Sequence, residues 1–310
     1  MGETPVRHLD RAEVAAALPW EGLVAALRAM FRDGCTAPLR HRHDLPEGGT
    51  LLLMPALGAT HSGVKVVHVA PGNAARGLPA VHAEYLLSDV RTGAPVALLD
   101  GGELTDRRTA AASVLAASFL ARRGSRRLLV LGAGKVAAAL AEAHHAHFTL
   151  EEVAIWSRRP AQAQALAERL RGHGVPARAA PTPDPRGFDI VSSATLAAAP
   201  LIHGSDLQPG QHLDLVGAFT ARMREADAAA VARALVVADT RAGVLAEGGD
   251  VVQAIAEGAV TEAHVAAELA DLCRGTHPGR TDPDQVTLFK SVGWAGEDLA
   301  AAMLAVSARR

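Results

Sequence analysis

Residues 127–140 read RLLVLGAGKVAAAL, and this stretch decides how the chain can fold. The unbroken apolar run Leu128–Leu131 is typical of a strand that is buried on both faces. Two glycines follow at once: Gly132 permits a tight turn, and Gly134 lets a pyrophosphate approach the backbone. The small side chain of Ala137 lets the next helix pack closely on the strand. The stretch therefore predicts a dinucleotide-binding turn, with the phosphates at a helix N-terminus.

The helical pattern after this turn continues to about His147. We expect Gly132, Gly134, Lys135 and Val136 to contact the cofactor. The alternative is a packing turn in an ordinary α/β domain. The order of strand, glycine turn and helix favours the nucleotide-binding interpretation.

The composition is that of a globular chain with room for two domains. The chain has 310 residues, of which 49% are hydrophobic. Its net charge of −2, without a basic block, argues against nucleic acid as a partner. No apolar run approaches the roughly 20 residues of a membrane span, and residues 1–5 do not resemble a signal peptide. Cys35 and Cys273 form no metal or redox motif, so we expect reduced thiols and a cytoplasmic protein.

Lysine is rare in this chain. Of the 31 lysines and arginines, only Lys65, Lys135 and Lys290 are lysines. Such a bias is typical of a GC-rich genome, in which surface lysines drift to arginine. A lysine that persists is expected where the planar guanidinium would not serve.

The first hundred residues change from helical to strand periodicity. Residues 10–34 are predicted to be helical, with Asp10 as the cap, Pro19 as a break and Gly34 at the end. Over residues 38–100, short apolar runs alternate with turn signals. This pattern predicts a meander of antiparallel or mixed strands.

The remaining chain alternates between helices and buried strands. An Ala-rich helix is expected from about residue 105 to 122, and residues 125–290 then predict a doubly wound parallel sheet. Its later strands are expected at Val153–Trp156, Ile190–Ser193, Leu213–Val216 and Leu235–Ala238. A last helix over residues 296–308 is expected to return to the first domain.

Two basic residues lie in settings that suit carboxylate binding. Lys65 lies inside the apolar run Val64–Val67, where it either faces solvent from the sheet or points into a cleft; the pattern alone favours solvent. Arg108 lies near a predicted helix start, where a guanidinium can bind a carboxylate through two hydrogen bonds. The alternative is a surface arginine, which is our interpretation of its neighbour Arg107.

The second strand of the nucleotide-binding unit ends at Trp156 and is followed by Ser157, Arg158 and Arg159. Domains that prefer NAD place an acidic residue near this point to bind the ribose 2′-hydroxyl. A serine and two arginines suit the 2′-phosphate of NADP instead. The alternative is a basic turn that faces solvent.

The histidines do not predict a metal site. His41 and His43 form one group, and His144, His145 and His147 form another. In the second group, His144 and His147 share a helix face, but no carboxylate or third ligand is evident nearby. No nucleophile elbow and no Cys/His pairing indicates covalent catalysis.

Short motifs in a fixed order run along nearly the whole chain. They are Pro38-x-Arg40, Met54-Pro55, Val64-Lys65, Pro71-x-Asn73, Gly77-Leu-Pro79, Thr92-Gly93, Leu104-Thr105-x-x-Arg108-Thr109, the glycine turn, Ser193-Ala-Thr195, Pro209-Gly210, Val216-Gly217, Glu268-Leu269, Gly279-Arg280 and Thr287-Leu-Phe-Lys290-Ser291-Val-Gly293. In these motifs the chain resembles the ornithine cyclodeaminase/mu-crystallin family. The resemblance implies an α+β substrate-binding and dimerisation domain, residues 1–122 with 291–310, and a Rossmann domain, residues 123–290.

The resemblance also implies roles for residues that match the family motifs. Arg40, Lys65 and Arg108 would bind the substrate carboxylate, and Lys65 would also assist proton transfer. Arg42 offers an alternative alignment for Arg40. Further residues expected to line the cofactor near its nicotinamide are Thr195, Val216 and Ser291.

One departure from the family pattern concerns Phe219. Cyclodeaminases of the family carry an aspartate at this position, two residues after the glycine of Val216-Gly217. Phenylalanine cannot shuttle a proton, and here it would line an apolar part of the substrate pocket. In this segment the chain resembles the ketimine reductases of the family, which act on Δ1-pyrroline-2-carboxylate and Δ1-piperideine-2-carboxylate.

These expectations define an NAD(P)H-dependent reductase of small cyclic imino acids, which prefers NADPH, can also use NADH and acts as a homodimer. Three alternatives remain open. The first is an ornithine or lysine cyclodeaminase with recycled NAD+, and the second is an amino-acid dehydrogenase of the alanine dehydrogenase type. The third is a ligand binder of the mu-crystallin type without enzymatic activity.

Overall fold

The computed structural model describes residues 6–307, which form two compact units. The first unit contains the described residues up to Arg108 and those from Trp294 onward, and the second unit is Thr109–Gly293. The predicted division after residue 122 differs from this one, because helix α3 (Gly101–Leu120) is continuous and contributes to both units. Residues 1–5, which do not resemble a signal peptide, and Ala308, the predicted end of the last helix, lie outside the described residues.

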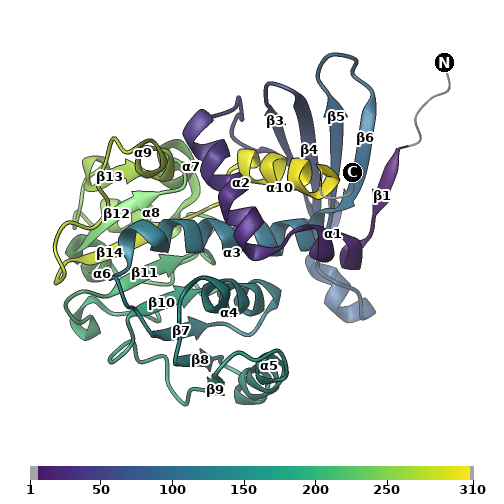
Figure 1. Ribbon diagram of the computed structural model, residues 1–310. Helices are drawn as coiled ribbons and strands as arrows, with labels where there is room; N and C mark the ends of the chain where they lie inside the picture. Colours follow the sequence, from purple (N-terminus) through teal and green to yellow (C-terminus); the bar gives the residue numbers. More distant parts are fainter. Residues whose placement is uncertain (1–5, 308–310) are drawn as a thin grey trace. The chain divides into compact units, whose positions relative to one another are not determined.

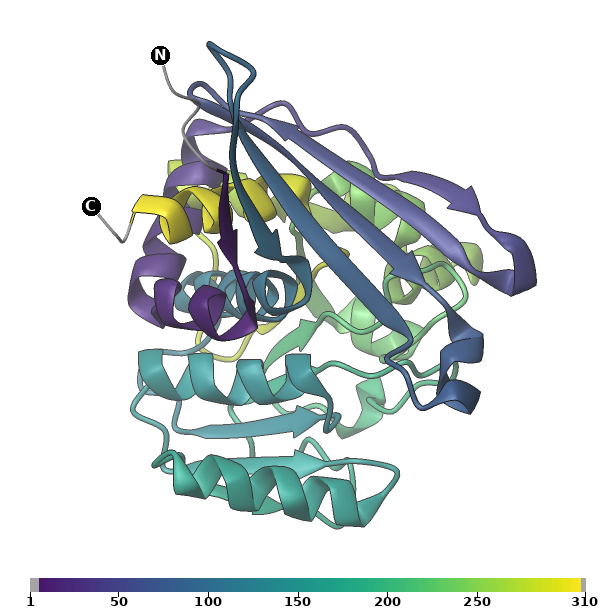
Figure 2. The same ribbon diagram turned by 90° about the vertical axis from the view of Figure 1, so that its right-hand side faces the viewer.

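The first unit is built on a six-stranded sheet of order β1-β6-β5-β4-β3-β2 (Figure 2). Its strands are β1 Arg7–Leu9, β2 His41–Asp44, β3 Thr50–Leu57, β4 His61–Val69, β5 Val81–Asp89 and β6 Pro95–Asp100. Strands β2 to β6 pair antiparallel in chain order, and β1 joins β6 in parallel. The predicted meander is therefore confirmed.

Three helices lie on one side of this sheet, two of them packed on its strands and one packed on another helix (Figures 1 and 2). They are α1 Arg11–Ala17, α2 Trp20–Asp33 and α10 Ala295–Ser307. Asp10 caps α1 in a capping box with Glu13, Pro19 precedes α2, and Gly34 ends α2 with a φ of 81°. Helix α10 packs on α2 and on β3, β4 and β5, so the predicted return of the C-terminal helix is confirmed.

The second unit contains an eight-stranded parallel sheet of order β13-β12-β14-β11-β10-β7-β8-β9. Its strands are β7 Arg127–Leu131, β8 Glu152–Trp156, β9 Ala177–Ala179, β10 Ile190–Ser193, β11 His212–Leu215, β12 Ala234–Ala238, β13 Val265–Glu268 and β14 Val286–Lys290. From β7 the chain adds β8 and β9 on one side, and it then continues with β10 on the other side of β7. The order of strand addition therefore reverses between β7 and β10.

Helices cover both faces of this sheet (Figure 1), which confirms the predicted doubly wound α/β fold. Those of the second unit are α4 Lys135–His147, α5 Pro160–Gly172, α6 Ala228–Arg233, α7 Arg241–Glu247, α8 Gly249–Ala256 and α9 Leu269–Arg274. Alternate residues of β7 serve the two cores: Leu128 and Val130 pack towards α4 and α5, and Leu129 and Leu131 towards α6, α7 and α8.

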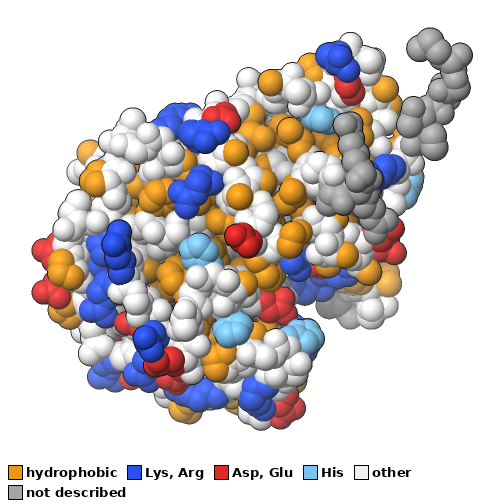
Figure 3. Space-filling model, in the orientation of Figure 1, with side chains coloured by type: hydrophobic (Ala, Val, Ile, Leu, Met, Phe, Trp, Pro, Cys, Tyr) orange, Lys and Arg blue, Asp and Glu red, His pale blue; other side chains and the backbone are white. Residues whose placement is uncertain are grey.

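On the face shown in Figure 3, basic side chains are interspersed with acidic, apolar and neutral ones. By length and composition, no single helix within residues 6–307 could cross a membrane, although α1 and α2 pass that test jointly as a pair bent by 77°.

Candidate functional site

The glycine turn joins β7 to α4 in the second unit. Gly132 has a φ of 122°, and a Cβ atom there would lie 2.6 Å from the carbonyl oxygen of Ala194, so only glycine fits. Gly134 is the N-cap of α4 and is exposed, and no side chain caps the first turn of this helix. Lys135 is exposed and Val136 is half-buried in that turn. The turn thus presents backbone N–H groups to solvent and fits the pyrophosphate of a dinucleotide.

The carboxyl end of β8 lies beside this turn, since β8 pairs with β7. Ser157 follows the strand, and its Oγ accepts a hydrogen bond of 3.3 Å from the N–H of Arg159. The side chains of Arg158 and Arg159 are exposed, and neither forms an ion pair with another described residue. This strand end therefore carries two accessible guanidinium groups and no acidic residue.

Thr195, Val216 and Ser291 lie at the same edge of the sheet. They follow β10, β11 and β14, which are consecutive neighbours beyond β7. Ser291 Oγ donates a hydrogen bond of 2.8 Å to Asp239 Oδ2. The second unit thus brings the predicted cofactor residues together at the carboxyl edge of one parallel sheet, where open α/β sheets bind their ligands.

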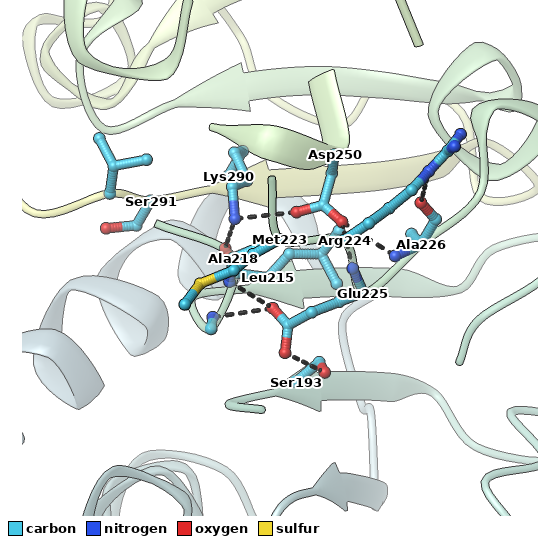
Figure 4. A network of polar contacts seen from close by, with 12 residues as sticks. Ser193, Leu215, Ala218, Met223, Arg224, Glu225, Ala226, Asp250, Lys290 and Ser291 are labelled. Atoms are coloured by element: carbon cyan, nitrogen blue, oxygen red, sulfur yellow. Dashed lines mark hydrogen bonds and ion pairs between the residues drawn. The ribbon is translucent and has the colours of Figure 1, made fainter. Parts of the chain in front are cut away.

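The carboxylate of Glu225 holds this edge together (Figure 4). It accepts hydrogen bonds from Ser193 Oγ at 2.5 Å, from the N–H and Oγ1 of Thr195 at 2.7 and 2.8 Å, and from the N–H groups of Gly217 and Ala218 at 2.7 and 3.2 Å. One buried side chain therefore fixes the residues that follow two central strands.

Asp250 and Lys290 extend this network (Figure 4). Asp250 Oδ1 accepts hydrogen bonds from the N–H groups of Glu225 and Ala226, at 2.6 and 2.9 Å. Lys290 Nζ lies 2.9 Å from Asp250 Oδ2 and donates to the carbonyl oxygen of Leu215 at 3.2 Å. Burial raises the pKa of Glu225 to about 7, while the charge of Lys290 favours the ionised carboxylate. Because all five groups that contact the Glu225 carboxylate are donors, its charged form suits the site.

Glu225 and Asp250 were not among the predicted site residues. The spacing of Glu225 and Asp250 to the strand ends follows no periodic pattern. Lys290 was indicated by the scarcity of lysine and by its place in a family motif, but not as a site residue. Phe219, in the same segment, is 37% exposed. Asp227 caps α6 through the N–H of Ala230 and also accepts from the N–H of Gly204.

In the first unit, Lys65 lies on the buried face of the sheet. Met54, Lys65, Tyr85 and Leu99 are direct partners across β3, β4, β5 and β6, and all four are buried. Only 2% of Lys65 is exposed, so the solvent-facing orientation that the pattern favoured is wrong. Its Nζ lies 2.8 Å from both carboxylate oxygens of Asp298.

Arg108 joins the same cluster from α3. Its Nε donates to Asp298 Oδ1 at 2.9 Å and its Nη1 to Glu297 Oε2 at 2.6 Å. The helix begins four residues earlier than predicted, at Gly101, because Asp100 caps it through the N–H of Glu103. Arg108 therefore lies about two turns inside the helix, is buried, and is not a surface residue.

Arg107 is not a surface arginine either. Its guanidinium donates to the carbonyl oxygen of Leu18 at 2.8 Å through Nη2 and lies 4.0 Å from the ring centre of Trp20. The sequence prediction for this residue is wrong because Trp20 covers a side chain that local sequence would leave in water.

The charges of this cluster act on one another. Burial and the charge of Arg108 lower the pKa of Lys65 to about 8, whereas Asp298 opposes them. Burial alone would raise the pKa of Asp298, but Arg108 and Lys65 outweigh it, so the pKa lies below its usual value. Arg40, just before β2, is half-buried, and its charge also lowers the pKa of Lys65. Arg42 is exposed and pairs with Asp44, so the geometry favours Arg40 over Arg42.

The histidine groups remain apart from these clusters. His41 and His43 are exposed on β2, whereas His144 is fully buried in α4 with its Nδ1 2.9 Å from the carbonyl oxygen of Leu140. Burial lowers the pKa of His144 to about 4. Within residues 6–307, no group of three or more His, Cys, Asp or Glu side chains is arranged to hold a metal ion.

Known proteins resemble this chain over almost its full length. The sequence profile of the ornithine cyclodeaminase/mu-crystallin family matches residues 21–308. A Δ1-pyrroline-2-carboxylate reductase of Paracoccus denitrificans is 42% identical over 302 residues, which cover 94% of this chain and 94% of that protein.

Solved structures show the same fold at lower identity. The Thermococcus litoralis Δ1-pyrroline-2-carboxylate reductase, in complex with NADH and L-proline, is 32% identical, with a TM-score of 0.93 over 98% of this chain and 97% of that one. An archaeal alanine dehydrogenase dimer with bound NAD is 27% identical, with a TM-score of 0.91 over 98% of this chain and 95% of the other.

Glu225→Gln should lower the free energy of unfolding by about 3 kcal/mol, because a neutral amide offers one acceptor oxygen where the carboxylate accepts from five donors. Urea unfolding followed by far-UV circular dichroism measures this change. The matched control is Glu257→Gln, whose carboxylate pairs with Arg224 but is 49% exposed; it should destabilise the protein far less than Glu225→Gln does. Equal destabilisation by the two variants would contradict the central place of Glu225.

Proposed function

The chain belongs to the ornithine cyclodeaminase/mu-crystallin family, and we propose that it is a nicotinamide-dependent enzyme that reduces the C=N bond of small cyclic ketimines. The observation that carries this proposal is the buried pair of cations in the first unit, Lys65 and Arg108. A substrate with a carboxylate beside its reacting carbon needs such an anchor, and the carboxyl edge of the parallel sheet fits the cofactor.

The charge of the first unit's cluster suits an anionic substrate. Lys65, Arg108 and the nearby Arg40 carry three positive charges, while Glu297 and Asp298 carry two negative ones. A substrate carboxylate can bind among these cationic side chains. Within residues 6–307, Arg108 uses Nε and Nη1 for its ion pairs, so the Nη2 hydrogens remain for the substrate.

The chemistry needs few further groups. A protonated C=N bond is already electrophilic, and a bound NAD(P)H supplies the hydride. Gly132, Gly134, Lys135 and Val136 would hold the phosphates, while Thr195, Val216 and Ser291 would line the nicotinamide. Lys65 would orient the carboxylate and supply a proton from Nζ to the ring nitrogen.

The preferred substrates are Δ1-pyrroline-2-carboxylate and Δ1-piperideine-2-carboxylate, with L-proline and L-pipecolate as products. Phe219 supports this choice because an apolar side chain favours ring methylenes over a second ammonium group. The cyclodeaminase alternative needs a base for the amine at this position. Glu225 and Asp227 are the nearby carboxylates, and both are already occupied by backbone N–H donors.

Wild-type enzyme should oxidise NADPH in the presence of either cyclic imine, as followed by absorbance at the nicotinamide band, and should form no proline or ammonia from L-ornithine and NAD+.

Lys65→Ala and Arg108→Ala should each lower kcat/KM by about 30-fold or more, since each removes a charged contact to the substrate worth about 2–5 kcal/mol. Both variants should still bind NADPH, because both residues lie in the first unit.

The alternatives give different results in the same assay. Proline and ammonia formed from ornithine at a catalytic rate would restore the cyclodeaminase interpretation. Oxidation of NADPH by pyruvate with ammonia, but not by the imines, would indicate an alanine dehydrogenase. Binding of the imines without turnover would indicate a ligand binder. Near-normal kcat/KM in either variant would contradict the carboxylate anchor.

NADPH is the preferred cofactor and NADH a weaker one. Support comes from Ser157, Arg158 and Arg159, which provide two exposed guanidinium groups where a ribose-binding acid would otherwise lie.

Arg158→Ala should raise the KM for NADPH severalfold and leave the KM for NADH nearly unchanged, because the side chain would contact only the 2′-phosphate. Steady-state kinetics with each cofactor measures both values. Equal or higher efficiency of the wild-type enzyme with NADH would rule out the preference.

The enzyme acts as a homodimer in the cytoplasm. Within residues 6–307, no helix of the first unit packs on the other face of its sheet, and this face presents half-buried apolar side chains that include Val64, Val66, Leu86 and Leu98. Such a face suits a second copy of the chain. Within residues 6–307, Cys35 and Cys273 form no disulfide, which suits a reducing compartment. Light scattering should give twice the monomer mass, and Val66→Glu should shift the protein to monomer. A wild-type protein that is monomeric at micromolar concentration would contradict this assignment.

A further inference from the structure

Four ionised side chains are buried together in the first unit. The exposed fractions of the side chains are 2% for Lys65, 6% for Arg108 and 0% for both Glu297 and Asp298. Removing such charges from water costs several kcal/mol for each ion unless an opposite charge lies close by. The arrangement of the two acids therefore decides which orientations of the two cations are possible.

Asp298 is the residue that contacts both cations. Its Oδ1 accepts hydrogen bonds from Lys65 Nζ and Arg108 Nε, and its Oδ2 lies 2.8 Å from Lys65 Nζ. Glu297 contacts Arg108 through Nη1. Asp298 thus links β4 to α3 through one carboxylate. By occupying fixed donors of Lys65 and Arg108, it also determines which of their N–H groups are available to a further anion.

The position of Asp298 is itself fixed. Glu297 and Asp298 lie in the first turn of α10, where the helix dipole favours negative charge. The turn is held by a hydrogen bond of 3.0 Å from the N–H of Glu297 to the carbonyl oxygen of Trp294. The ring of Trp294 packs on that of Phe31, with centroids 4.9 Å apart. A Cβ at Gly296 would meet this ring at 2.5 Å, so the indole packs directly against the backbone of the turn.

The other groups near Lys65 do not replace Asp298. Arg108 and Arg40 oppose the positive charge of Lys65, and Asp298 favours it. Tyr85, on β5, interacts electrostatically with Asp298 and with Cys35, which lies in the segment after α2. Burial raises the pKa of both side chains, to about 11 for Cys35. Both groups are therefore neutral at pH 7.

We propose that Asp298 is the positioning residue of the substrate site: it holds the Lys65 ammonium and the Arg108 guanidinium in one arrangement and keeps Lys65 charged. The substrate part of this inference rests on the proposed function. Asp298 acts through the two cations and does not contact the substrate. Its loss leaves two buried cations adjacent to each other, which favours the neutral amine of Lys65 and releases the Arg108 side chain.

The scarcity of lysine makes a direct test possible. With 13C-labelled lysine ε-carbons, the protein gives signals from only Lys65, Lys135 and Lys290, and the Lys65 signal is the one absent from Lys65→Arg. In the wild type, Lys65 should titrate near the value of about 8. In Asp298→Asn the titration should move to lower pH by about one unit or more. The matched control Asp33→Asn, which removes an exposed partner of Arg32, should leave it unchanged.

A Lys65 titration in Asp298→Asn within about 0.3 unit of the wild type would overturn the proposal. This measurement needs no turnover, so it separates the role of Asp298 from the proposed function. A wild-type enzyme that reduces no imine defeats the proposed function, whereas the lysine titration still decides whether Asp298 keeps Lys65 charged.

Kinetics tests the positioning role. In Asp298→Asn the basic limb of kcat/KM against pH should move with the Lys65 titration; loss of activity with an unmoved limb would indicate a merely structural role and overturn the proposal. Asp298→Glu keeps the charge but displaces the carboxylate, and it also serves if Asp298→Asn does not fold. It should raise the substrate KM and weaken product inhibition by L-proline about tenfold or more, with NADPH binding unchanged. If the substrate KM and the inhibition by L-proline in Asp298→Glu both equalled the wild-type values, the proposal would be overturned.

Discussion

A lysine buried against an aspartate organises each unit of this protein. Lys65 with Asp298 joins a strand to the C-terminal helix, and Lys290 with Asp250 joins a strand to the segment that carries Glu225. Because a buried charge without a partner is costly, each pair constrains elements that hydrophobic packing alone would leave free to shift. The hydrophobic cores stabilise the two units, and these ion pairs fix the residues at which chemistry is proposed to occur.

The parts of the fold predictable from sequence are those whose signal is local. The glycine turn, the Asp10 cap and the meander depend on a few consecutive residues, and all are present. Strand β14 was not predicted as a strand, because Thr287 and Lys290 interrupt its apolar pattern although both are buried. The burial of Lys65 could not be inferred either, since its partner Asp298 lies 233 residues away. The apolar residues on both sides of Lys65 give no indication of which face is covered.

The candidate site shows the same division between local and distant information. Motif positions located Lys65, Arg108 and the residues after the parallel strands, and the structure groups them within their units. The carboxylates that hold these residues, Glu225 and Asp298, were missed because they act through side-chain geometry that no spacing rule describes. Phe219 differs from these residues because its significance lies in the absence of an acidic group at its position. The nearest carboxylates, those of Glu225 and Asp227, accept hydrogen bonds from backbone N–H groups.

The return of α10 to the first unit has a consequence for synthesis on the ribosome. The second unit is one uninterrupted segment, Thr109–Gly293, and can fold as soon as it has emerged. The first unit lacks α10 until Ala295–Ser307 has been translated, so Lys65 and Arg108 have no counter-ions from that helix while the second unit is being made. Residues 6–108 therefore emerge before the second unit but complete their core after it, and a nascent chain that ends before Glu297 would carry Lys65 on β4 and Arg108 on α3 without either counter-ion.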